Sequence, residues 1–192
     1  MSDSDQKSDP QVLIEHKFGE AKFFLGNMEV ENLRLDSPNL VYNNPDSFIY
    51  NFSAFTGALY SINDFLTTTE GYTAIKNWLD DDSKKQMYDI LISREEGIRQ
   101  ISVHHKEAFD ENDITVVDVL TMKTEKMTGK YGVNYVFAEK KSGNGVLEPP
   151  LLEEYRGEYT YGGRVYVPVT SFSNRFLYDV VHPCLECQGL RK

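Results

Sequence analysis

The sequence predicts an α+β protein in which an N-terminal four-helix bundle precedes a small antiparallel β-rich segment. Up to about residue 104, apolar residues recur at intervals of three and four, which is helical spacing. After the sequence FDEND, β-branched and alternating segments take over, and Gly162–Gly163 marks a tight hairpin turn. We therefore expect a bundle over residues 11–109 and a β-rich C-terminal segment over residues 110–192.

The N-terminal residues differ in composition from the predicted first helix. Residues 1–10 are polar and acidic and end at Pro10, so we expect them to be disordered. Residues 11–32 carry an apolar stripe that includes Ile14 and Phe18, which predicts the first helix. A stretch with two prolines and three asparagines, residues 33–45, is typical of a loop.

The other three helices of the bundle follow between residues 44 and 104. Asn44 or Asp46 can cap the second helix, with Pro45 in its first turn. Its apolar stripe consists of Phe48, Phe52, Phe55, Leu59, Ile62 and Leu66. A short helix is expected over residues 72–79. The acidic sequence DDD at 80–82 suits the positive end of a further helix, predicted over residues 83–104.

The β-rich part is predicted from three segments. Residues 114–122 are β-branched, residues 130–139 alternate, and residues 158–169 form two short strands around the glycine pair. Residues 174–181, NRFLYDVV, fit either a last strand or a short helix.

Composition and charge narrow the function classes. The 192-residue chain has a net charge of −10, which opposes loose, charge-driven binding to nucleic acid. No apolar run approaches the roughly 20 residues that span a bilayer, and the N-terminus is acidic, unlike a signal peptide. With only two cysteines, we expect a cytoplasmic protein without a membrane partner.

One motif suggests a reaction. The sequence RQISVH places Arg99, Gln100 and His104 in the pattern of an arginine, a polar residue and, after four intervening positions, a histidine. Together with EAKFFLGNMEVENL and the aromatic helix FIYNFSAFTGALYSINDFL, it resembles the HEPN superfamily. The likeness covers roughly residues 11–109.

This resemblance implies a metal-independent endoribonuclease that acts in toxin–antitoxin systems or phage defence. His104 would be the general acid or base, Arg99 would stabilise the phosphorane, and Gln100 would orient a phosphate. Substrate contacts would extend to Arg94, His105 and Lys106. Because one chain offers one motif histidine at this site, the resemblance also implies a homodimer that pairs two motifs around the RNA.

Other interpretations remain open for the same residues. Arg99 lies four residues after Glu95, an ordinary ion-pair spacing, and a place near a helix C-terminus accounts for His104 without an active site. Five residues turn an ideal helix by about 140°, so the two side chains share a face only if the helix ends between them. The alternative function is a non-catalytic HEPN-like binding or assembly module, either a neutralising partner of a basic protein or a complex subunit.

The tail sequence HPCLEC supplies a possible metal site. His182, Cys184 and Cys187 are three zinc ligands in type, and a fourth would have to come from His16, His104, His105 or a second chain. A redox dithiol and two ordinary thiols are the alternatives. Apart from this possible zinc, no cofactor is expected.

Overall fold

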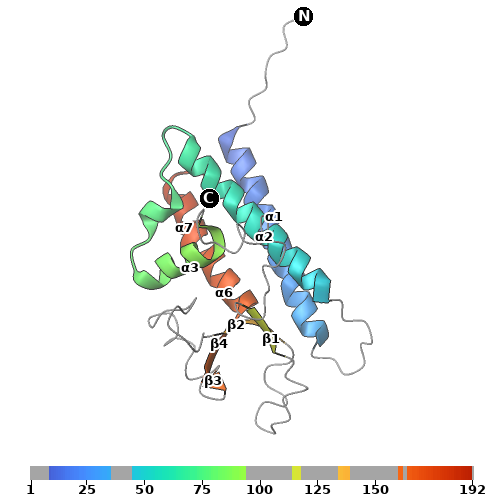
Figure 1. Cartoon of the computed structure of the whole chain (residues 1–192). Helices are drawn as coiled ribbons and strands as arrows, with labels where there is room; N and C mark the ends of the chain where they lie inside the picture. Colours follow the sequence, from blue (N-terminus) through green and yellow to red (C-terminus); the bar gives the residue numbers. More distant parts are fainter. Residues whose placement is uncertain are drawn as a thin grey trace, which may run out of the picture.

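The computed structural model describes residues 9–35, 45–93, 114–117, 134–138, 160–161 and 164–191, and this part of the chain is predominantly helical (Figure 1). The helices are α1 (Pro10–Leu35), α2 (Pro45–Thr68), the 3-10 helix η1 (Ile75–Trp78), α3 (Asp82–Ile92), α6 (Val169–Arg175), the π-helix η2 (Phe176–Val181) and α7 (His182–Cys187). Among the described residues, no helix combines the length and the apolar character that crossing a bilayer requires.

Helices α1 and α2 form a long antiparallel pair that supplies half of the core (Figure 1). The α1 side chains that face this core are Ile14, Phe18, Ala21, Leu25 and Met28. Every member of the stripe predicted on α2, from Phe48 to Leu66, is buried. The two long helices predicted from apolar spacing are therefore confirmed.

The C-terminal helical segment, formed by α6, η2 and α7, supplies much of the remaining core, together with residues of η1 and α3. Its buried side chains come in neighbouring pairs, with Phe176 beside Leu177, Val180 beside Val181, and Cys184 beside Leu185. All of them belong to the same hydrophobic cluster as α1 and α2. The π-helix is visible in the bond from the His182 N–H to the Leu177 carbonyl, five residues back.

This segment makes the predicted fold class wrong. The protein is predominantly helical and not an α+β protein with a β-rich C-terminal segment, because residues 169–187 are helical and packed into the bundle. Residues 174–181 were ambiguous because a short apolar run does not separate strand from helix. Burial against α1 and α3 decides in favour of the helix.

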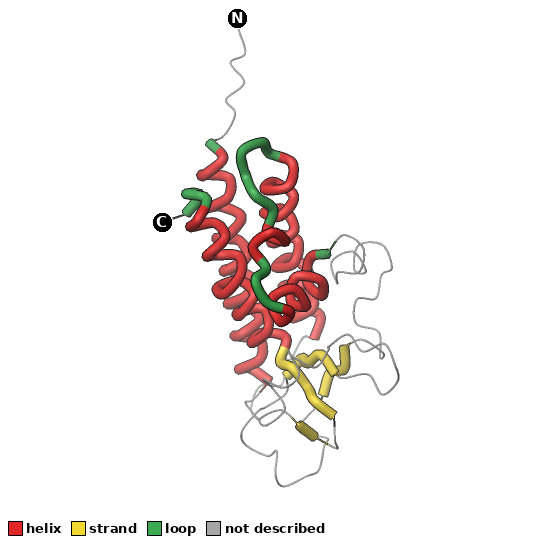
Figure 2. The backbone as a smooth tube through the Cα atoms, turned by 90° about the vertical axis from the view of Figure 1, so that its left-hand side faces the viewer, coloured by secondary structure: helices red, strands yellow, loops and turns green. Residues whose placement is uncertain are grey.

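Four short strands lie at one end of the helical part (Figure 2). They are β1 (Ile114–Val117), β2 (Asn134–Ala138), β3 (Thr160–Tyr161) and β4 (Arg164–Pro168). They pair antiparallel in the order β1-β2-β4-β3. With two to five residues each, they do not change the helical character of the described chain.

Helix α3 is shorter than the sequence predicted. It begins as expected at the acidic run, where the Asp81 carboxylate caps it by accepting a hydrogen bond from the Lys84 N–H at 2.7 Å. It ends at Ile92, because Ser93 leaves helical geometry with φ −54° and ψ 141°. The prediction that this helix continues to residue 104 is wrong.

Candidate functional site

The residues predicted to bind and cleave RNA lie outside the described part of the chain. They are Arg94, Arg99, Gln100, His104, His105 and Lys106. Helix α3, which was expected to carry the motif at its end, stops seven residues before Arg99. The catalytic assignment therefore stays a prediction and does not rest on α3.

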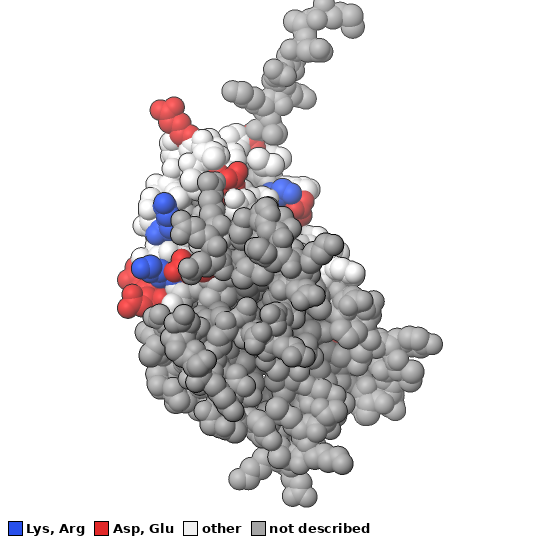
Figure 3. Space-filling view, in the orientation of Figure 1, with Lys and Arg blue, Asp and Glu red and all other residues white. Residues whose placement is uncertain are grey.

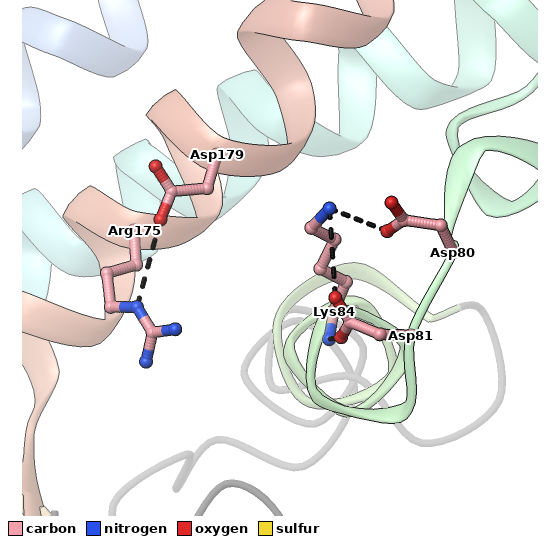
Figure 4. A network of polar contacts seen from close by, with 5 residues as sticks. All are labelled: Asp80, Asp81, Lys84, Arg175 and Asp179. Atoms are coloured by element: carbon pink, nitrogen blue, oxygen red, sulfur yellow. Dashed lines mark hydrogen bonds and ion pairs between the residues drawn. The ribbon is translucent and has the colours of Figure 1, made fainter. Parts of the chain in front are cut away.

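The described residues form a different candidate site, an open groove between α3 and the C-terminal helical segment (Figure 4). Its volume is about 390 Å³. Its lining consists of Asp81, Asp82, Ser83, Lys84, Met87, Arg175 and Asp179. We call it the α3–η2 groove.

The α3 wall of the groove carries a network of charged side chains. The Lys84 ammonium lies 2.6 Å from Asp80 Oδ1 and 3.7 Å from Asp81 Oδ2. The hydrogen bond to Asp80 raises the pKa of Lys84 and lowers the pKa of Asp80. Lys84 is thus charged and already held by two carboxylates of its own chain.

The opposite wall comes from the junction of α6 and η2. Arg175 ends α6, and its Nε lies 3.8 Å from Oδ2 of Asp179 in the π-helix. Asp179 is exposed, whereas its neighbour Val180 is buried. The π-helix therefore presents a carboxylate to the groove while its other side fills the core, and such segments often occur at functional sites.

The groove combines an acidic rim with an apolar residue beneath. Asp81, Asp82 and Asp179 outnumber the two cations in the lining, and Asp80 lies beside it. Met87 is 1% exposed and belongs to the core. Acidic and basic side chains lie together at the η1–α3 edge of the surface in Figure 3.

The acidic run was visible in the sequence, but only as a helix start. Nothing in the sequence linked it to Arg175 and Asp179, which lie about a hundred residues later. Their meeting depends on α3 packing beside η2, a tertiary contact without a local signal.

The possible zinc ligands do not gather. Cys184 is buried, and its sulfur accepts a hydrogen bond from Gln188 Nε2 at 3.2 Å. Burial raises the pKa of the Cys184 thiol to about 11. Cys187 is exposed, and His182 packs its ring against Phe18.

Over the described ranges, no three His, Cys, Asp or Glu residues are grouped to hold a metal ion. The zinc site considered for His182, Cys184 and Cys187 stays a prediction, because two of the fourth ligands considered for it, His104 and His105, lie outside the described residues.

No family model, no curated protein and no solved structure matches the chain.

Proposed function

We propose that the protein is a non-catalytic helical binding module that holds a basic segment of a protein partner in the α3–η2 groove. The observation that carries this proposal is the excess of carboxylates in an open groove whose cations are already engaged. Lys84 is held by Asp80 and Asp81, and Arg175 lies beside Asp179. The net field at the groove is therefore negative and favours an incoming cation.

The shape of the groove suits a lysine or arginine side chain. Such a side chain has an apolar stem and a charged tip. The stem would lie over Met87, and the tip would reach the exposed carboxylates of Asp82 and Asp179. A volume of about 390 Å³ lies within the range of ordinary ligand pockets.

A labelled lysine- and arginine-rich peptide tests the proposal, with a peptide of the same length and acidic side chains as the negative ligand. We expect binding that weakens as salt is raised, because screening reduces attraction at an exposed site. Asp82→Asn combined with Asp179→Asn should weaken binding about tenfold, the loss of two charge-assisted contacts. Glu70→Gln, a distant exposed carboxylate, is the control. Equal binding by both variants would overturn the proposal.

The second candidate is a metal-independent endoribonuclease of the HEPN type. The observation that favours it is the Arg99, Gln100 and His104 spacing within a chain that resembles that superfamily. RNA incubated with the protein in excess chelator should be cut by the wild type and left intact by Arg99→Ala and His104→Ala. The Lys76→Ala variant, which changes an exposed basic residue on η1, should cut the RNA normally. An inactive wild type would remove this candidate.

The two candidates predict opposite outcomes for the same variants. Binding of the basic peptide should survive Arg99→Ala, and RNA cleavage should survive the paired groove substitutions.

For either function we expect a cytoplasmic protein, because the cysteines are free and form no disulfide framework. A neutralising role in a toxin–antitoxin or phage-defence complex would be consistent with the acidic groove.

A further inference from the structure

Helix α1 carries apolar side chains on two opposite faces. One face lies in the core, through Ile14, Phe18, Ala21, Leu25 and Met28. The opposite face, which we call the outer α1 face, consists of Val12, His16, Gly19, Phe23, Gly26 and Val30. Its large apolar residues are exposed, with Val12 at 59%, Phe23 at 64% and Val30 at 45%. An ordinary surface helix places polar residues there.

The spacing of this outer face is that of a helix–helix contact. Its six positions follow one another at intervals of four, three, four, three and four, the alternation of a coiled-coil seam. A surface helix that serves only its own bundle needs one such stripe, and α1 already has one on its core side.

The two glycines of the outer face are unexplained by the fold of one chain. Glycine weakens a helix interior relative to alanine, because the chain loses more freedom on folding. A Cβ atom added at Gly19 or Gly26 would meet nothing within 4 Å. Close approach of another element of the same chain therefore does not explain the glycine at either position.

The face is complementary to itself when two copies run antiparallel. Centred between Gly19 and Phe23, the spacing reads the same in both directions, so each position meets a defined position of the second copy. Val12 meets Val30, His16 meets Gly26, and Gly19 meets Phe23. The largest side chain of each copy thus lies over a residue without a side chain, and the same match occurs twice around a two-fold axis.

We propose that the outer α1 face binds a second copy of this chain, with the two α1 helices antiparallel and each Phe23 ring seated over Gly19 of the other copy. This contact does not involve the residues that line the α3–η2 groove, so it is independent of the proposed binding function.

Cysteine pairs test the orientation. In a Cys187→Ser background, Val12→Cys with one affinity tag is mixed with Val30→Cys with another, and the mixture is mildly oxidised. Cys184 is buried and stays unreactive. We expect a disulfide between the two different chains. Each variant alone should not cross-link with itself, because 18 residues of helix separate like positions by about 27 Å.

Three results would overturn the proposal. A Val12→Cys chain that cross-links with itself would show parallel packing, and a mixture without any cross-link would show that the face is not shared. Wild-type chain that sediments as a monomer over the whole accessible concentration range gives the same negative answer.

Substitution of Gly19 distinguishes an effect on the proposed dimer contact from an effect on the stability of the helix. Gly19→Leu should leave the helix folded, since a Cβ meets open space in one chain, but it fills the position of the partner ring. We expect dimerisation to weaken about tenfold or more, as overpacking does in a close-packed contact. Lys76→Leu on η1 is the control and should not change it. An unchanged dimer in Gly19→Leu would exclude the proposed seat for Phe23.

Discussion

The side-chain amide of Gln188 pairs with the backbone of Thr73 through two hydrogen bonds. The Thr73 N–H donates to Oε1 of Gln188 at 2.5 Å, and Nε2 of Gln188 donates to the Thr73 carbonyl at 3.0 Å. The same Nε2 lies 3.2 Å from the Cys184 carbonyl, so the residue also stays attached to α7. One side chain therefore ties the end of the last helix to the loop that follows α2.

Removal of this pairing should destabilise the fold. We expect Gln188→Ala to lower the free energy of unfolding by about 1–3 kcal/mol, because two backbone groups lose their partner. Equilibrium unfolding in urea measures the change. Gln11→Ala, which removes an exposed side-chain bond to Glu15, is the matched control and should stay within about 0.5 kcal/mol. Equal effects of the two substitutions would contradict the role given to Gln188.

The two phenylalanines on opposite faces of α1 should behave differently. The Phe18 ring is 0% exposed, lies against His182 and has the Arg191 guanidinium 3.8 Å from its centroid. Phe18→Ala should therefore cost about 3–5 kcal/mol of unfolding free energy. Phe23→Ala, measured in dilute monomer, should change it by less than about 0.5 kcal/mol. Comparable losses would show that α1 is packed on both faces within one chain.

Stability at high pH should depend on Cys184. Burial raises the pKa of this thiol to about 11 from an ordinary value of 9.0, so the folded chain keeps a proton that the unfolded chain releases. Its contribution is complete below pH 9 and decreases as the pH rises from 9 toward about 11. Unfolding at pH 8, 9 and 10 should therefore show a steeper loss for the wild type than for Cys184→Ala. Parallel curves would contradict a buried, neutral thiol.

Substitutions of Asp81, the residue that caps α3, should distinguish the effect of its hydrogen bond from the effect of its charge. Asp81→Ala removes the acceptor for the Lys84 N–H and should cost about 1 kcal/mol of unfolding free energy. Asp81→Asn retains an acceptor oxygen and should recover most of that loss. Denaturant titration of both variants provides the comparison, and an asparagine variant as unstable as the alanine one would show that only the negative charge matters.

Apolar spacing was sufficient to predict the long helices. On α2, the six residues of the predicted stripe are all buried. The stripe could be recognised because a helix of 24 residues repeats the apolar spacing several times. The start of α3 was also predictable, since the capping aspartate forms a contact within four residues of sequence.

The C-terminal helix could not be predicted in the same way. Its buried residues include the neighbouring pairs Phe176–Leu177 and Val180–Val181, and an apolar run this short fits a buried strand as well as a helix. The end of α3 was missed because helix-forming residues continue past Ser93, whereas the backbone leaves helical geometry at that residue.

The π-helix also has a consequence for how the length of this chain can vary. A π turn holds one residue more than an α turn, so loss of a single residue near Tyr178 would convert the wide turn into an ordinary one. Leu185 would then keep its orientation toward the core. The same deletion inside α2 would rotate every later side chain of that helix away from its neighbours. Homologous chains one residue shorter should therefore carry their gap at η2.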